Sequence, residues 1–292
     1  MTESNAQTPA GLAPAAQGPA AAPAGLAPTT PGPAAAPARL APTTPGPAAL
    51  PELRTAVGIA MLGQQVIVHG KDLHHECLGL SFVHFVLFSI TGRSFEAKVA
   101  RVLEQLWIAT GYPDARIWCN RIAAYLGSAR VDAGLALSAA IAASNSVGYG
   151  FRALDAAYLV QRELPTNEAE RARWLEAQLD AGRVLAGYGR PVHKHDERIA
   201  AALQSLADAE LKAGPALHGA FWLDRRLREA KGIEMNIAAL WAALAIDFGL
   251  DRREYEAFML LMFVPGYLAV YKEQRERPAL SFLAGYQTRA PG

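Results

Sequence analysis

The first fifty residues constrain this chain most, because they cannot contribute to a packed core. They consist almost entirely of Ala, Pro, Gly, Thr and Leu, and a Leu-Ala-Pro motif returns every fourteen residues from Leu12, Leu26 and Leu40. Proline fixes φ and removes a backbone donor, and this composition buries too little apolar surface to offset the entropy of folding. We therefore predict an extended, disordered arm over residues 1–50, either a tether or docking arm or without function, and a folded domain over residues 51–292.

Composition narrows what the folded part can be. About 240 residues suit one large domain or one domain with a small lobe. The net charge of +1, with no single-sign run of five or more, gives no support for a nucleic-acid partner. Cys77 and Cys119 lie far apart without a CxxC spacing, which favours a reducing compartment and no disulfide. No long apolar run and no signal-peptide pattern are present, so we expect no membrane contact and a cytoplasmic location.

From Leu53 onward, apolar residues recur at spacings of three and four, and very few segments alternate with period two. This pattern predicts an all-α fold, with a possible short hairpin or strand within residues 57–69. The segment 132–145 is small and apolar all round, as a buried helix would be. Ser94 is the expected N-cap of a helix that ends at Gly111. The expected helical segments are 72–78, 82–90, 95–111, 132–145, 167–185, 197–213, 219–231, 237–248 and 253–276.

The segment GYGRPVHKHDER, residues 187–198, is the richest in chemistry. A turn flanked by glycines exposes backbone N–H groups, and the nearby cations would attract a small anion. Histidines ionise near neutrality, so His193 and His195 are candidates for proton transfer, and Asp196 could orient one of them. Arg190 and Arg198 could each hold a carboxylate through two parallel hydrogen bonds.

This segment resembles the one in the citrate synthase superfamily that begins G-[FY]-G-H and ends D-P-R. In that family it grips coenzyme A with its backbone, and an oxo-acid carboxylate with its histidine and its final arginine. Residues 57–276 follow the order of the short, citryl-CoA lyase-like members. The resemblance implies an all-α citrate synthase-like fold with a large and a small lobe, the small one at about 150–250, and a homodimer in which the apolar helix at 132–145 suits the interface. It assigns coenzyme A contacts to Gly187, Tyr188, Gly189, Val192 and Lys194, and substrate contacts to Arg198, Arg190 and Asn236.

The chain departs from the family pattern at four chemically important positions. The catalytic histidine of the family falls near Tyr149 and its catalytic aspartate falls on Ala238. The histidine after the glycine turn is Arg190, and a substrate-binding arginine falls on Phe263. The remaining candidates for catalysis are His193, His195 and Tyr149, the last as a donor to an enolate oxygen.

Three functions follow as hypotheses. The first is an enzyme that makes or breaks a carbon–carbon bond between an acyl-CoA and an oxo-acid, with coenzyme A thioester and di- or tricarboxylate as substrates and no tightly bound cofactor. The second is a catalytically degenerate homologue that binds CoA or a metabolite, or pairs with an active partner. The third is a different carbon–carbon chemistry built on the same CoA site.

Two other motifs are interpreted as structural. His74, His75, Glu76 and Cys77 do not share one face of a helix, so we predict no metal site there. The segment 214–220, GPALHGA, mimics a family loop but follows the glycine turn, where the family places that loop before it. We predict that it is a helix break followed by a helix N-terminus.

Overall fold

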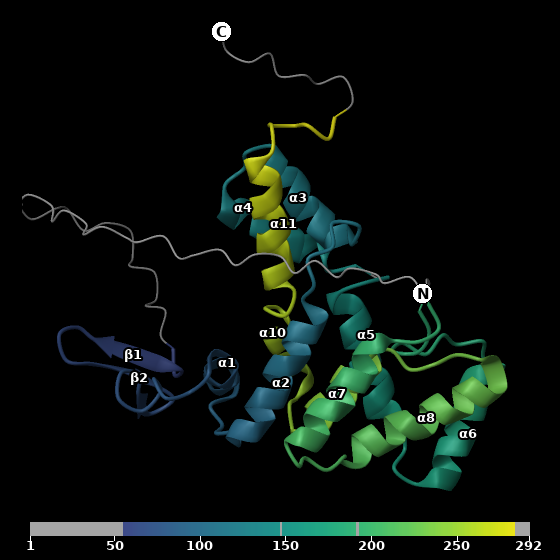
Figure 1. The fold of residues 1–292 in the computed structure, drawn as a ribbon. Helices are drawn as coiled ribbons and strands as arrows, with labels where there is room; N and C mark the ends of the chain where they lie inside the picture. Colours follow the sequence, from purple (N-terminus) through teal and green to yellow (C-terminus); the bar gives the residue numbers. More distant parts are fainter. Residues whose placement is uncertain (1–54, 147, 191–192, 284–292) are drawn as a thin grey trace, which may run out of the picture. The chain divides into compact units, whose positions relative to one another are not determined.

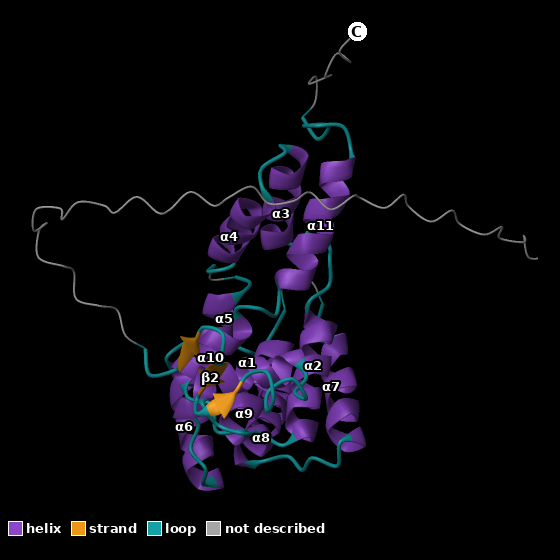
Figure 2. Cartoon of the chain, turned by 90° about the vertical axis from the view of Figure 1, so that its left-hand side faces the viewer, coloured by secondary structure: helices purple, strands orange, loops and turns teal. Residues whose placement is uncertain are grey.

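The computed structural model describes residues 55–146, 148–190 and 193–283, so the predicted arm at 1–50 lies outside the described residues. The described part is mainly helical, with one small antiparallel sheet in the order β1-β2-β3 (Figures 1 and 2). The strands are β1 (Gly58–Met61), β2 (Gln65–Val68) and β3 (Lys71–Asp72). The helices are α1 (Phe82–Thr91), α2 (Ala97–Thr110), α3 (Trp118–Ser128), α4 (Ala133–Ala143), α5 (Phe151–Glu163), α6 (Glu168–Asp180), α7 (Glu197–Asp208), α8 (Pro215–Lys231), α9 (Ile237–Asp247), α10 (Arg252–Met259) and α11 (Val264–Glu276). The predicted all-α class is confirmed.

The segment between the strands and α1 differs from its prediction. The hairpin expected within residues 57–69 is present, with Gly58 opposite Val68. The helix expected over 72–78 is wrong, because Asp72 ends β3 and turns follow it. The Asp72 carboxylate accepts hydrogen bonds from the amides of His74 and His75, at 2.8 and 3.0 Å. Such local side-chain bonds offer the backbone an alternative to a helix.

Several predicted helix boundaries shift by a few residues. Helix α2 begins at Ala97 with Glu96 as its N-cap, rather than after Ser94. The helix expected over 253–276 is two helices, α10 and α11, separated by residues 260–263. Pro265 lies in the first turn of α11, where its missing N–H costs nothing, whereas in the interior of one continuous helix it would remove a hydrogen bond and clash with the preceding turn.

The remaining boundary shifts and omissions are smaller. Helices α6 and α7 end at Asp180 and Asp208, before the predicted 185 and 213. The break predicted at 214–220 is confirmed, with Gly214 as N-cap and Pro215 opening α8. Helices α3 and α5 were not predicted at all.

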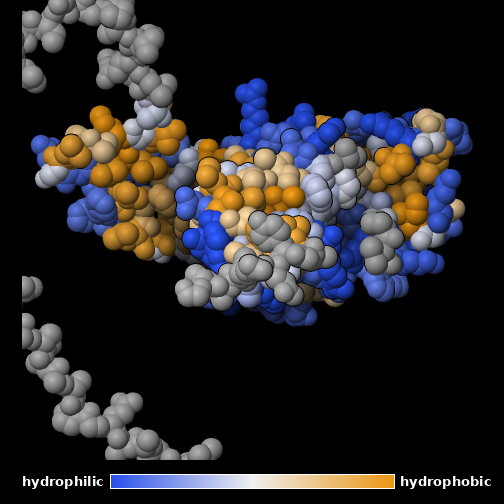
Figure 3. All heavy atoms as spheres, turned by 90° about the horizontal axis from the view of Figure 1, so that it is seen from above, coloured by the Kyte–Doolittle hydropathy of each residue, from blue (hydrophilic) through white to orange (hydrophobic). Residues whose placement is uncertain are grey.

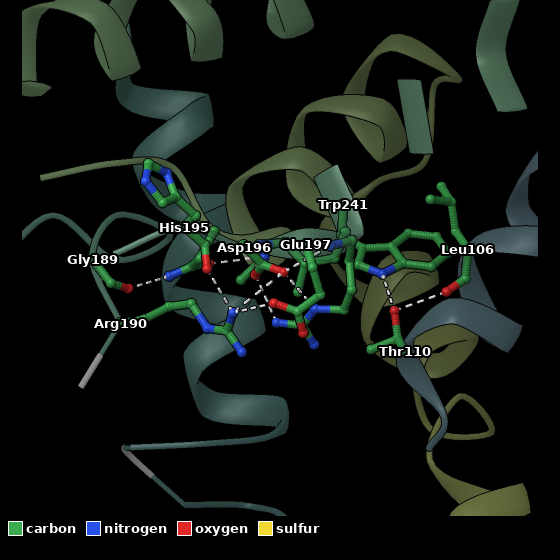
Figure 4. Close-up of polar contacts among 12 residues, drawn as sticks. Leu106, Thr110, Gly189, Arg190, His195, Asp196, Glu197 and Trp241 are labelled. Atoms are coloured by element: carbon green, nitrogen blue, oxygen red, sulfur yellow. Dashed lines mark hydrogen bonds and ion pairs between the residues drawn. The ribbon is translucent and has the colours of Figure 1, made fainter. Parts of the chain in front are cut away.

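The core is centred on α9. Nine of its eleven residues, Ile237 to Ala245, are buried, and it packs against α5, α7 and α8. Trp241 Nε1 donates to Thr110 Oγ1 of α2 at 3.4 Å, which ties α9 to a further helix (Figure 4). Because α9 is apolar on every side, its position is set by packing all round, and its N-terminus is held firmly at the site described below.

Helices α3, α4 and α11 pack on one another. Gly127 of α3 lets the backbone of α11 approach closely, since a Cβ there would lie 2.4 Å from the Tyr271 carbonyl oxygen. The expectation that 132–145 is a buried helix is wrong for the single chain. Only Ala136 and Ala140 of α4 are buried, and Leu135 is 65 % exposed. Figure 3, which looks onto this end of the molecule, shows apolar surface there and on the β1–β2 hairpin.

Among the described residues, no helix is long and apolar enough to cross a membrane. The division of 51–292 into two lobes remains a prediction.

Candidate functional site

The glycine turn is locked onto the N-terminus of α9. Gly187 and Gly189 have φ of 90° and 85°, a region that favours glycine. The amide of Asn236 donates to Gly187 O at 2.8 Å, and Gly189 N donates to Glu234 O at 2.7 Å. A Cβ on Gly187 would lie 2.7 Å from the Ala239 Cβ, whereas a Cβ on Gly189 would meet no atom nearer than Ile233 Cγ2 at 3.5 Å. Glycine is therefore required at position 187 for two reasons: its φ is positive, and α9 approaches it too closely for a side chain.

Asn236 uses both ends of its amide side chain to hold this junction. Its Nδ2 donates to Gly189 O at 2.8 Å, and its Oδ1 accepts from Ala238 N at 2.9 Å as the N-cap of α9. The predicted substrate-binding residue is thus engaged by the backbone. Its contribution is to fix the turn against α9.

Upstream of Gly189, the turn runs from the exposed Val184 to the buried Leu185 and Gly187. The N–H groups of residues 184–187 have no backbone acceptor among the described residues. Val184 is 88 % exposed, while Tyr188 is buried and its hydroxyl bonds Ala220 O and Gln161 Nε2. A cavity of about 220 Å³ lies beside these amides, and its lining includes Arg183 and Lys231. Free N–H groups and two cations make this cavity attractive to an anion.

Four charged residues form what we call the ion-pair centre: Arg190, Asp196, Glu197 and Arg198. Figure 4 labels Arg190, Asp196 and Glu197 and shows polar contacts among them and the residues around them. Arg198 Nε and Nη2 each donate to the Asp196 carboxylate at 2.7 Å, a bidentate pair. Asp196 has no exposed side-chain surface and also accepts from Ile237 N at 2.8 Å. It is the N-cap of α7 as well, accepting from the Arg198 amide. One carboxylate therefore joins α7, α9 and a buried guanidinium.

The charges of this centre stabilise one another. Burial by itself would raise the pKa of Asp196, but the Arg198 guanidinium and the Ile237 amide outweigh it and hold the pKa below its usual range. Burial likewise opposes the charge of Arg198, yet the Asp196 carboxylate raises the pKa of Arg198. Both groups are therefore ionised at neutral pH. Arg198 Nη1 has no acceptor among the described residues, so it can still donate a hydrogen bond to a ligand oxygen.

Arg190 occupies the outer side of the centre. Its Nη1 donates to Glu197 at 2.7 Å and to His195 O at 2.9 Å, and lies 3.8 Å from Asp196. The hydrogen bond from Arg190 lowers the pKa of Glu197. The His195 ring is 80 % exposed and pairs with Glu234 at 2.5 Å.

The other motif residues contribute less to the centre. His193 and Lys194 are exposed, and Val192 lies outside the described residues. The structure therefore brings Arg190 and Arg198 together around Asp196, and leaves the two histidines at the surface.

Tyr149 borders this centre from the loop between α4 and α5. Burial raises the pKa of Tyr149 above its ordinary value, and nearby Arg198 and Arg190 offset part of the rise. Its phenol is therefore protonated at neutral pH and can donate a hydrogen bond, but it does not act as a base.

On its other side Tyr149 joins an aromatic cluster, defined as Tyr149, Phe151, Phe263 and Tyr267. Phe263 is 5 % exposed, and its ring centroid lies 5.5 Å from those of both Tyr149 and Phe151 and 6.3 Å from that of Tyr267. Phe263 is also the N-cap of α11, where the resemblance places an arginine. Ala238, where the resemblance places an aspartate, lies in the first turn of α9 and is 9 % exposed.

Sequence reasoning missed three residues of this region. Arg183 and Lys231 line the small cavity, and the Tyr112 ring lies 5.9 Å from the Arg198 guanidinium carbon. Arg183 lies just before the glycine turn, so its sequence position was a usable signal. Lys231 and Tyr112 come from distant helices and loops, and only the fold reveals them. In the part of the chain that the structure describes, no group of three or more His, Cys, Asp or Glu residues is placed to hold a metal.

Solved structures show the same fold. The citryl-CoA lyase of Hydrogenobacter thermophilus has a TM-score of 0.70 at 19 % identity, covering 82 % of this chain and 96 % of its own. An ATP citrate lyase of Methanosaeta concilii in complex with (3S)-citryl-CoA has a TM-score of 0.65 at 13 % identity, covering 82 % of this chain and 42 % of its own. Citrate synthase of Thermoplasma acidophilum, solved with carboxymethyl coenzyme A and oxaloacetate, has a TM-score of 0.57 at 20 % identity, covering 73 % of this chain and 58 % of its own.

The fold is thus that of citrate synthases and citryl-CoA lyases, and its extent matches the short lyase over nearly the whole lyase chain. The model of the citrate synthase C-terminal domain matches residues 48–281, and this chain belongs to the citrate synthase family. No curated protein matches the sequence.

Proposed function

We propose that this protein binds a CoA thioester at residues 183–189 and an organic acid at Arg198, and makes or breaks the carbon–carbon bond beside the thioester. The observation that carries the proposal is the cavity lined by Arg183 and Lys231 together with Val184 and Leu185, whose amides have no backbone acceptor among the described residues. Coenzyme A is a polyphosphate, and backbone N–H groups with flanking cations are the usual protein site for such anions. Neighbours of the same fold that were solved with citryl-CoA or carboxymethyl coenzyme A support this choice.

The organic acid would contact the guanidinium atoms that are not used by the ion pairs within the centre. Asp196 occupies Nε and Nη2 of Arg198, so Nη1 is the atom available to a carboxylate. Arg190 lies on the more exposed side of the centre and can add a second cationic contact. A di- or tricarboxylate such as oxaloacetate or citrate suits a site with two guanidinium groups.

Tyr149 supplies the donor in the proposed chemistry. In the cleavage direction, a base takes the proton of the substrate hydroxyl and the C–C electron pair moves to the CoA fragment as an enolate, which is then protonated. The protonated phenol of Tyr149 stabilises the enolate oxygen by a hydrogen bond. His193 and His195 remain the candidate bases, with His195 oriented by Glu234.

A second candidate function is binding without catalysis. Ala238 and Phe263 carry no ionisable group where the resemblance places an aspartate and an arginine, and Phe263 is packed among aromatic rings. Such a chain would bind CoA or a metabolite, or pair with an active partner.

Turnover measurements separate these candidates. The purified protein is incubated with acetyl-CoA or propionyl-CoA and a panel of oxo-acids, while free thiol is followed, and separately with citryl-CoA, while the acetyl-CoA and oxaloacetate produced by cleavage are followed. We expect turnover that falls by about 10²-fold or more in Tyr149→Phe, with CoA affinity retained. CoA binding without turnover would support the second candidate. A protein that shows no CoA binding and no turnover would contradict both candidates.

We also propose that the protein is a homodimer through α3, α4 and α11. Trp118, Tyr125, Leu135 and Leu268 of these helices are 54, 42, 65 and 44 % exposed, which is an unusual concentration of apolar surface for a monomer. Leu135→Glu should shift sedimentation from dimer to monomer. Leu203→Glu on α7, which is 38 % exposed on a different helix, is the matched control.

A further inference from the structure

A cavity of about 600 Å³ lies between the C-terminal end of α4, the first turns of α5, and α10. It shares no residue with the glycine turn or the ion-pair centre. Its volume falls within the range of roughly 300–1,000 Å³ in which small-molecule sites are found. The proposed function does not use it.

The walls of this cavity are mainly apolar. Ile141, Phe151, Leu154 and Met259 contribute side chains to it, and Leu260, which is 42 % exposed, also lines it. A ligand with an apolar body would remove this surface from water, which is favourable. The apolar residues of the lining do not distinguish one apolar ligand from another. The charged residues of the lining decide which ligand binds.

Two cations of the cavity are unpaired. Arg252 donates to both carboxylate oxygens of Asp155, at 2.6 and 2.7 Å, and lies 3.4 Å from Glu256. The two acidic residues of the lining, Asp155 and Glu256, are therefore both engaged by one guanidinium. Arg152 and Arg253 also line the cavity, and neither side chain has a hydrogen-bond or ion-pair partner among the described residues. The cavity thus combines apolar walls with two available guanidinium groups.

We propose that this cavity binds a monocarboxylate with an apolar chain. Its carboxylate pairs with Arg152 and Arg253, and its chain lies against Phe151, Leu154 and Met259. A guanidinium binds a carboxylate through parallel hydrogen bonds, so the head group is fixed in orientation as well as in charge. This ligand differs from the compact di- or tricarboxylate proposed for Arg198, because one end of it must be apolar.

The cavity also adjoins the loop that carries Tyr149. The backbone of Phe151 donates to Ser144 O at 2.9 Å, and Asn145 pairs with Gly150 across the loop. The ring of Phe151 lines the cavity and lies 5.5 Å from Phe263 of the aromatic cluster. A bound chain would therefore pack against a residue that also contacts the cluster.

Calorimetric titration with dodecanoate tests this proposal on the full chain. We expect one site per chain, weaker binding of octanoate, and no detectable binding of acetate. The double change Arg152→Gln with Arg253→Gln should weaken dodecanoate at least about ten-fold and leave dodecanol unchanged. Arg173→Gln on α6, an exposed arginine that does not line the cavity, is the matched control and should change neither.

Filling the cavity provides an independent test. Ala257→Trp should abolish binding of dodecanoate and dodecanol alike, and Ala142→Trp, on the opposite wall, serves if the first variant fails to fold by circular dichroism. Many weak sites, or affinity that none of these changes alters, would overturn the proposal. A parent that binds no dodecanoate while Ala257→Trp shifts its sedimentation would also overturn it, and would assign the cavity to contact with a second copy. A titration with CoA, run in parallel, tests the proposed function separately, because the proposed CoA site lies elsewhere in the molecule.

Discussion

Tyr149 belongs to the aromatic cluster and borders the ion-pair centre, and these two regions differ in composition, because one is charged and the other is aromatic. In the centre, one buried carboxylate has several partners: Asp196 accepts hydrogen bonds from the Arg198 side chain, from the Ile237 amide and from the first turn of α7. In the cluster, Phe263 packs among rings where the resemblance places a cation. Three retained motif residues, Gly187, Asp196 and Asn236, hold the turn, α7 and α9 together. The four positions where the chain departs from the family pattern are those to which the resemblance assigns catalytic or substrate-binding side chains.

Removing the carboxylate of the centre should have the largest effect. Asp196→Ala leaves Arg198 buried without a partner, frees the Ile237 amide and removes the N-cap of α7. We expect a loss of about 3–5 kcal/mol in the free energy of unfolding, measured by urea titration. The double variant Asp196→Ala with Arg198→Met removes the unpaired charge and should recover part of that loss. A cost below about 1 kcal/mol for the single change would show that the pair does not hold this region.

The same pair predicts a pH dependence. The folded-state pKa of Asp196 lies below its unfolded value, so its contribution to stability is present above the unfolded pKa and is lost as pH falls through the folded pKa. Unfolding free energy should therefore decrease with acidification below about pH 4, and less steeply in Asp196→Ala than in the parent. Equal slopes in the two proteins would contradict the assignment.

The two glycines of the turn differ in a way that substitution can resolve. Gly187→Ala combines a positive φ with a Cβ placed 2.7 Å from Ala239, and should cost about 2–4 kcal/mol. Gly189→Ala has the same φ problem but no atom nearer than 3.5 Å, and should cost about 1–2 kcal/mol. Thermal and urea unfolding measure both. Equal costs would mean that α9 does not approach the turn as closely as described.

Arg198→Lys tests whether the centre also binds substrate. Lysine has no counterpart of Nη1, the atom that Asp196 leaves free for a ligand carboxylate, so we expect the affinity for oxaloacetate or citrate to fall by about 1.5–3 kcal/mol in calorimetry. CoA affinity should change little, because its proposed site does not include Arg198. Arg190→Lys, on the more exposed side of the centre, is the comparison variant and should lose less. If Arg198→Lys binds both acids as the parent does, Arg198 is structural only.

The aromatic cluster should tolerate a conservative change. Phe263→Leu keeps an apolar side chain at the N-terminus of α11 and should cost less than about 1.5 kcal/mol in unfolding free energy. CoA and acid affinities should be unchanged, which separates packing from binding. A large loss of acid affinity in this variant would mean that Phe263 contacts the ligand directly.

The helical class and most helices could be predicted from the sequence because apolar spacing records which face is buried. Helix α9 is the clearest case, since its continuous apolar run lies in the interior. Helix α4 has the same pattern and is largely exposed, because a pattern shows which residues avoid water but not which chain covers them. The break before α11 was missed even though Pro265 marks it. The turns after β3 depend on hydrogen bonds to the Asp72 side chain, which the spacing of apolar residues does not reveal.

The candidate site was predictable only in part. The motif located the turn and both arginines, since these residues are close in sequence. It did not reveal that Asp196 neutralises Arg198, or that Asn236 is committed to the backbone on both sides. Lys231 and Tyr112 are brought to the site by α8 and by a loop remote in sequence, so no local pattern could assign them, whereas Arg183 lies only four residues before Gly187 and could have been included.

The central claim is the proposal that the region of the glycine turn binds coenzyme A, although four positions of the family pattern carry other residues in this chain. Calorimetric titration of coenzyme A tests it most directly, in the parent, in Arg183→Gln with Lys231→Gln, and in the control Arg173→Gln. We predict one site per chain in the parent and the control, and at least about ten-fold weaker binding in the double variant. A parent without measurable affinity at millimolar coenzyme A, or a double variant that binds as tightly as the parent, would contradict the claim.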